Sequence, residues 1–258
     1  SIGALRGPWI FLAFGLSVMG VTGCATKTVV QKPIFYPPAP DEPRVQYLTS
    51  LSASLDIEPP RHWLLTFLTG YKGEVESLLK PYGVTVANSK IFVCDTALNC
   101  LCVFDLEHRS FSYFTPRGPG AISKPINADV DVDGGLYVAD ADRRRVVKYD
   151  AQGRYETAIT GDEAFRPVDA VARRDKVYVV DTKGRRVHVY DRASGDELPS
   201  IPAGTVTNAE EALFLPTNAD VDDEGNVYVT DAAAFRVQVY NPDGRYIKSI
   251  GSHGAGFG

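Results

Sequence analysis

Aspartates that recur at fixed positions are the residues of this sequence best suited to acid–base or metal chemistry. Three of them precede an arginine by five residues, in the pairs Asp140 and Arg145, Asp181 and Arg186, and Asp231 and Arg236. An isolated carboxylate could act as a general acid or base, but a residue present in every copy of a repeat usually serves the fold. We expect each carboxylate to meet its arginine across a tight loop, or to accept backbone N–H groups in that loop. Asp95 has the same position in an earlier copy, where Cys100 replaces the arginine.

A second acidic pattern, Asp129-x-Asp131-x-Asp133-Gly134, is similar to the start of a calcium-binding loop, and Asp140 falls at its twelfth position. A calcium loop normally leads into a helix and ends in a bidentate glutamate, whereas this one leads into the β-prone run LYVAD. A similar acidic turn recurs later in the chain, at Asp220, Asp222 and Glu224. We therefore expect a tight turn at these positions and no metal.

Three cysteines, Cys94, Cys100 and Cys102, lie on neighbouring predicted strands. Buried free thiols are the expected state; one disulfide, or a metal site completed by His108, are the alternatives. The absence of a C-x-x-C-H motif excludes c-type haem. The four histidines fall at different positions of the repeats, at His62, His108, His188 and His253. No G-x-S-x-G, P-loop or dinucleotide motif is present, so the sequence predicts no catalytic residue, no metal and no cofactor.

The elements that would position these residues are short β-strands in four sequence repeats. The chain has 258 residues, of which 44 % are apolar, and its 13 tyrosines, 12 phenylalanines and 23 glycines favour strands joined by turns. The repeats begin at Pro81, Pro125, Pro167 and Pro216, and a period of about 40–50 residues indicates a propeller or a solenoid. Each copy contains apolar runs separated by Asp/Gly turns, which are hairpin signals. Four antiparallel strands per repeat predict an all-β propeller of four-stranded blades.

The repeats resemble the NHL family, whose blades start at a proline and pass through D-x-x-G-N-[IV]-Y-V-[AT]-D. The best match is Asp222–Asp231, and the resemblance covers residues 80–258. The family typically has six blades and this chain supplies about four, so the resemblance implies an incomplete six-bladed ring that forms an open arc. A small closed ring is the alternative. Within residues 45–79, the run 45–51 is expected to be a ring-closing strand.

The N-terminal segment predicts an export signal. Residues 9–23 are uncharged and mostly apolar, which is short for a membrane-spanning helix and suits a signal peptide. The run Val21-Thr22-Gly23-Cys24 resembles the bacterial lipobox, which implies removal of residues 1–23 and acylation of Cys24. Ala25, and not an aspartate, follows the cysteine, and by resemblance to Gram-negative lipoproteins this implies attachment to the outer membrane. The alternative is an uncleaved anchor. Residues 24–44 are rich in proline and are expected to form an extended tether.

The loops between the second and third strands of each repeat vary where the strands do not, and such loops often carry function. We expect a partner surface there, formed by Leu98, Arg143, Arg144, Lys183, Arg185 and Phe235; a solvated basic rim is the alternative. A net charge of −5 argues against nucleic acid. The sequence thus predicts an envelope lipoprotein that acts as a binding scaffold for a protein or polysaccharide. The rival function is a metal-dependent hydrolase or lyase of the kind carried by six-bladed propellers such as lactonases and amidating lyases.

Overall fold

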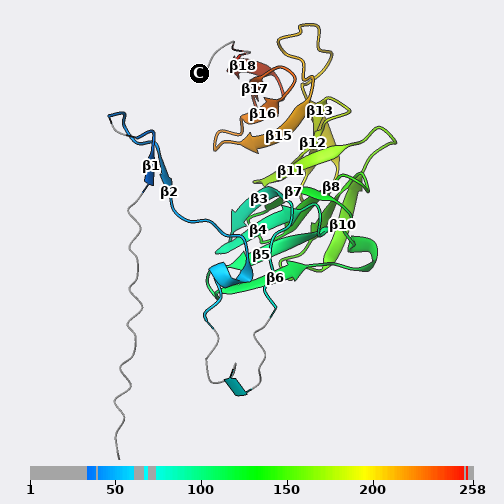
Figure 1. Ribbon diagram of the computed structural model, residues 1–258. Coiled ribbons are helices and arrows are strands. Elements are labelled where there is room, and N and C mark those ends of the chain that lie inside the picture. Colours follow the sequence, from blue (N-terminus) through cyan, green and yellow to red (C-terminus); the bar gives the residue numbers. More distant parts are fainter. Residues whose placement is uncertain (1–33, 39, 61–66, 69–73, 253, 255–258) are drawn as a thin grey trace, which may run out of the picture. The chain divides into compact units, whose positions relative to one another are not determined.

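The computed structural model describes residues 34–38, 40–60, 67–68, 74–252 and 254, and they form almost only β-structure (Figure 1). The chain divides into two units, Ser1–Thr49 and Ser50–Gly258. The second unit contains four antiparallel sheets, each with four strands in chain order. In the described part of the chain, no helix is long and apolar enough to cross a membrane.

The first sheet contains β3 (Pro81–Ala87), β4 (Lys90–Asp95), β5 (Cys100–Asp105) and β6 (Ser110–Phe114). The second contains β7 (Pro125–Val130), β8 (Leu136–Asp140), β9 (Arg145–Tyr149) and β10 (Tyr155–Thr160). The third contains β11 (Pro167–Arg173), β12 (Lys176–Asp181), β13 (Arg186–Asp191) and β14 (Glu197–Ile201). The fourth contains β15 (Pro216–Val221), β16 (Val227–Asp231), β17 (Arg236–Tyr240) and β18 (Tyr246–Ile250). Each predicted repeat is therefore one sheet.

The core lies between the sheets, because each inner sheet is covered on both faces. Val179 and Val180 are neighbours on β12, so their side chains point to opposite faces, yet both are fully buried. Val179 packs in one cluster with Tyr137 of the second sheet, and Val180 packs in another with Val227 of the fourth. This explains why the strands are runs of β-branched residues without an apolar–polar alternation.

The four sheets form an open arc, as the sequence predicted. The first strands of neighbouring sheets contact one another in the order β3, β7, β11, β15 (Figure 1). At the fourth position of these strands, Ala128 and Ala170 are buried by the preceding sheet, whereas Val84 of β3 is 61 % exposed. Val86, two residues later on β3, is 66 % exposed. The exposed Val84 and Val86 therefore mark the face of the first sheet against which another sheet would pack if the arc closed.

The run expected to close the ring pairs elsewhere. β2 (Val45–Tyr47) pairs antiparallel with β1 (Ile34–Tyr36) in a separate two-stranded sheet of the first unit. The outer part of the first sheet is covered instead by the short helix η1 (Ser54–Asp56) and its neighbours. There Ile57 packs in one cluster with Phe104 and Phe111.

Gly83 marks the closest approach of the first two sheets. A Cβ at this position would lie 2.8 Å from the Cα of Asn127, and it would clash with the Ile126 carbonyl. We expect Gly83→Ala to lower the free energy of unfolding by about 1–3 kcal/mol, because β3 and β7 would have to separate. Chemical denaturation measures the change, and Tyr82→Ala is the control because Tyr82 is 70 % exposed on the same strand. Equal stability of Gly83→Ala and the unchanged protein would contradict this tight packing.

Candidate functional site

The recurring aspartates accept backbone hydrogen bonds, which is the second of the two expected arrangements. Asp231 is fully buried, and its carboxylate accepts N–H groups from Phe214 at 2.8 Å, Leu215 at 2.9 Å and Ala234 at 3.3 Å. The first two donors belong to the chain entering the fourth sheet, and the third belongs to the loop between β16 and β17. Asp95 and Asp181 likewise accept N–H groups both from the chain entering their sheet and from the hairpin loop. Asp140 accepts N–H groups from the chain entering its sheet. Each carboxylate thus joins a hairpin loop or strand end to the preceding connection.

Two of the recurring arginines donate to carbonyl groups of those connections, and the third, Arg186, donates to the Gly184 carbonyl of its own loop at 3.4 Å. Arg145 donates to Ala121 at 2.8 Å, and Arg236 donates to Ala209 at 3.2 Å and Glu210 at 3.1 Å. In the described residues, no ion pair joins these arginines to the aspartates that precede them. The repeated pairs therefore have a structural role.

The three cysteines are buried and free in the structure. Burial raises the pKa of Cys94 to about 12, and the negative charge of Asp169 adds to the effect. A thiol with such a high pKa is a poor nucleophile. His108 lies on the surface with its side chain against Asp105, and the described residues contain no group of three acidic, histidine or cysteine side chains placed to hold a metal.

The calcium-like pattern forms a tight turn. Asp131 accepts the N–H groups of Asp133 and Gly135, and Gly134 has φ of +85°, a conformation that favours glycine. Arg192, from the third sheet, donates to Asp131 at 3.1 Å and Asp133 at 2.5 Å. A guanidinium group thus occupies the place at which the sequence pattern suggested a cation.

His188 is the one histidine that lies between two carboxylates in the described residues. Its Nδ1 lies 2.8 Å from Glu197 and its Nε2 lies 3.4 Å from Asp181. The hydrogen bond to Asp181 is the main reason that its pKa is raised. Both ring nitrogens are occupied within the third sheet, so this imidazole links three strands and is poorly placed to act as a general base.

The structure divides the predicted partner surface into two groups. Arg143 donates to Ala121 at 2.6 Å and Arg144 donates to the Glu163 carbonyl at 3.1 Å, so both guanidinium groups are tied to connections. Lys183 and Arg185 are exposed, and their side chains form no ion pair or hydrogen bond with described residues.

The two apolar loop residues also differ. Phe235 is 60 % exposed, as expected of a loop tip. Leu98 is half-buried and packs on the cluster that contains Ile57 and Phe104, so only part of its side chain is open to a partner. The segment before the first sheet covers it.

A polar cluster lies along the first strands of the sheets and was not predicted from the sequence. Asn127, Asp169 and Asn218 occupy the third position of β7, β11 and β15, and Asp129 and Asp220 occupy the fifth position of β7 and β15. Together with Arg173 and Thr85 they line a cavity of about 180 Å³. The repeated N-A-D at 127–129 and 218–220 was the available signal.

Burial has the largest effect on the electrostatics of these residues, which are called the axial cluster below. It raises the pKa of Asp169 to about 7, even though the carboxylate accepts N–H groups from Ala219 at 3.0 Å and Ala170 at 2.9 Å. Arg173 lies between the other two carboxylates, 2.7 Å from Asp129 and 3.3 Å from Asp220. Asp169 is therefore the acidic group of the cluster that has no arginine against it in the described structure.

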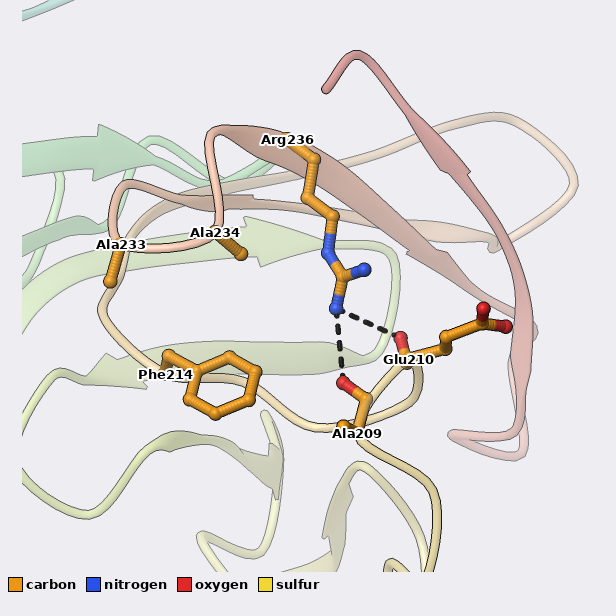
Figure 2. Close-up of a pocket in the computed structure, with 6 residues that line it drawn as sticks. All are labelled: Ala209, Glu210, Phe214, Ala233, Ala234 and Arg236. Carbon is orange, nitrogen blue, oxygen red and sulfur yellow. Dashed lines mark hydrogen bonds between the residues drawn. The ribbon is translucent and has the colours of Figure 1, made fainter. Parts of the chain in front are cut away.

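A second cavity lies beside the loop between β16 and β17 (Figure 2). Its volume is about 390 Å³. The lining residues come from that loop, from the start of β17 and from the connection 202–215, and they are Ala209, Glu210, Phe214, Ala233, Ala234 and Arg236. Figure 2 shows the Arg236 guanidinium group pointing between Phe214 and Glu210. No sequence motif marked this cavity, because the chain segments that form it are joined only by folding.

Comparison with solved structures decides the fold. Virginiamycin B lyase from Staphylococcus aureus superimposes with a TM-score of 0.52 at 13 % identity, over 65 % of this chain and 54 % of that chain. A chain of a nidogen/laminin complex gives 0.57 at 18 % identity, over 71 % and 70 % of the two chains. The fold is a β-propeller. Its four sheets are blades, and the loops between second and third strands lie with the blade-to-blade connections on one face, called the loop face below.

A third solved structure, Kuenenia stuttgartiensis hydrazine synthase, gives a TM-score of 0.52 at 16 % identity over 68 % of this chain and 50 % of that chain. This chain spans about half the length of the lyase chain that it matches. No family model and no curated protein matches the sequence. At these identities the likeness shows the fold alone.

Proposed function

We propose that this protein is a lipoprotein of the bacterial envelope, anchored through Cys24, and that its NHL-like propeller is a binding scaffold. The anchor rests on the lipobox-like run ending at Cys24, which lies outside the described residues. The sequence repeats, each corresponding to one blade, support the NHL-like assignment. Multiple acyl chains would hold the protein firmly, at about 0.8 kcal/mol for each buried methylene group.

The loop face carries the binding proposal, because its four hairpin loops share one backbone and differ in side chains. The last residue of each loop has a left-handed φ of 53° to 56°, at Asn99, Arg144, Arg185 and Phe235. The buried aspartates bond to the backbone around these loops, so the surface is formed before a partner arrives. A preformed surface binds without the cost of ordering loops.

Lys183 and Arg185 determine the kind of partner that this face suits. Both are exposed and neither is neutralised by a described carboxylate. Exposed, unpaired cations attract an anionic surface and raise the association rate at low salt. An acidic envelope protein or an acidic polysaccharide fits this description. A nucleic acid is a poor candidate for the partner, because the proposed protein is exported and its chain is acidic.

The double variant Lys183→Glu, Arg185→Glu tests the loop face. We expect cross-linking of the purified protein to envelope extracts to fall about tenfold, because the charge is reversed where no structural hydrogen bond is lost. The control Arg245→Glu, Lys248→Glu makes the same change of charge at exposed residues on and beside β18. Polysaccharide digestion of the extract separates the two partner classes. Equal cross-linking by both variants would contradict a role for this surface.

The membrane anchor is tested with Cys24→Ala. Cells that express the unchanged protein should incorporate labelled palmitate into it, and the variant should lose both the label and its membrane association. A variant that still sediments with membranes would contradict the lipid anchor and favour an uncleaved N-terminal segment.

The axial cluster supports a second candidate, a hydrolase or lyase. Asp169, Asn127 and Asn218 bring oxygen atoms to one small cavity, which is where six-bladed propeller enzymes place their catalytic groups. Oxygen donors of this kind suit calcium. Metal analysis of the purified protein, combined with turnover of lactone and amide substrates, tests the candidate. A stoichiometric metal whose removal abolishes turnover would overturn the scaffold proposal.

A further inference from the structure

The cavity of Figure 2 contains one cation, one anion and an apolar wall. Phe214 is 41 % exposed and forms the wall together with three alanines of the lining. Arg236 and Glu210 are the charged members. The volume of about 390 Å³ lies in the range of small-molecule sites. The alanines leave this space open, since larger side chains at those positions would fill it.

Arg236 is oriented in advance and keeps donors for a ligand. Its Nη2 donates to the Ala209 and Glu210 carbonyl oxygens at 3.2 Å and 3.1 Å. Nη1 forms no hydrogen bond with described residues. A guanidinium group that is fixed in this way binds carboxylates well, because little rotamer freedom remains to be lost.

Glu210 supplies the opposite charge. Its backbone carbonyl accepts from Arg236 and Gln238, whereas its carboxylate forms no ion pair or hydrogen bond with described residues. Figure 2 shows this carboxylate on the opposite side of the guanidinium group from Phe214. An anion beside the arginine penalises a ligand with a carboxylate alone, and favours a ligand that also carries an ammonium group.

We propose that this cavity binds a small zwitterion with an apolar side chain, which is the chemistry of a free hydrophobic α-amino acid. The ligand carboxylate binds Arg236, its ammonium group binds Glu210, and its side chain packs on Phe214. The inference deepens the proposed function, because it gives the loop face a small-molecule ligand, and it rests on that face being a binding surface.

Titration calorimetry of the purified full chain with four probes tests the charge pattern. The probes are phenylalanine, N-acetylphenylalanine, phenylalaninamide and phenylalaninol. We expect phenylalanine to bind about tenfold or more tightly than each probe that lacks one charge. If N-acetylphenylalanine binds as tightly as phenylalanine, the proposal that the ligand is a zwitterion is overturned. If phenylalanine does not bind, the proposed site itself is overturned.

Three variants locate the site. Ala233→Leu fills the cavity and should abolish phenylalanine binding, while Ala97→Leu is the matched control because Ala97 holds the same exposed loop position in the first blade. Glu210→Gln should reduce phenylalanine to the affinity of N-acetylphenylalanine. Unchanged affinity of Ala233→Leu would overturn the assignment to this cavity. If the unchanged protein does not bind phenylalanine but is still cross-linked to the envelope extract, this inference is rejected and the proposed scaffold stands. If it binds phenylalanine but is not cross-linked, the anionic partner is rejected.

Discussion

Replacement of Asp95 by alanine is expected to lower the free energy of unfolding by about 3–5 kcal/mol. The carboxylate is fully buried and accepts four backbone N–H groups, from Leu79, Lys80, Ala97 and Leu98, at 2.7 to 3.0 Å. Alanine would leave these donors without a partner, and an unsatisfied buried donor costs about 1–3 kcal/mol. The loss would also separate the loop after β4 from the chain that enters the first blade.

The replacement Asp95→Asn distinguishes this account from a simple loss of volume. Each carboxylate oxygen accepts two N–H groups, so an amide nitrogen in place of either oxygen would face two donors. We therefore expect Asp95→Asn to destabilise the protein nearly as much as Asp95→Ala. Asp142→Ala, at an exposed loop position, should change the stability by less than about 0.5 kcal/mol. Urea denaturation measures all three, and a stable Asp95→Asn would contradict the account.

The dependence on pH gives a second readout of the same carboxylate. Burial alone would raise the pKa of Asp95, but the four donated hydrogen bonds outweigh burial and hold it below the ordinary value. A lowered folded-state pKa contributes stability that is present above the unfolded pKa and is lost as the pH falls through the folded pKa. The stability difference between the unchanged protein and Asp95→Ala should therefore shrink in acid.

The strands were predictable from the sequence because their signals are local. The run LYVAD was expected to be a second strand after an acidic turn, and β8 is Leu136–Asp140. The valines of β12 needed only a repeat period and β-branched side chains to be placed in a buried blade. The choice between an ion pair and backbone acceptance at Asp231 was left open, because it depends on where the preceding connection runs.

The parts that escaped prediction depend on contacts between blades. Arg192 binds Asp131 from the next blade, and no spacing rule connects residues so far apart in the chain. Leu98 is covered by residues near Ile57, which precede the repeats. The cavity beside Arg236 forms because the connection 202–215 passes the loop between β16 and β17. Local sequence patterns therefore predict the strands of each blade, whereas contacts with neighbouring segments determine the surroundings of its side chains.

Contacts between blades also give the Asp169 carboxylate an unusual pKa. The same position holds asparagine in the second and fourth blades, at Asn127 and Asn218. The third blade is covered on both faces, and its acid is 3 % exposed. Burial is the largest cause of its raised pKa, and the charge of Asp129 adds to it. The pKa of about 7 places the titration of this axial acid near neutral pH.

We expect Asp169→Asn to remove a pH dependence of about 4 kcal/mol from the stability of the protein. Because the folded pKa is about 7 and the unfolded value is near 3.8, the contribution of Asp169 is fully present below the unfolded pKa and is lost as the pH rises through the folded pKa. The asparagine variant should therefore gain stability relative to the unchanged protein between about pH 4 and pH 7. Asp220→Asn is the matched control, since its side chain is 72 % exposed on the corresponding strand of the fourth blade. Parallel stability curves for Asp169→Asn and the unchanged protein over this range would mean that Asp169 is ionised throughout, and that solvent or a cation reaches the axis.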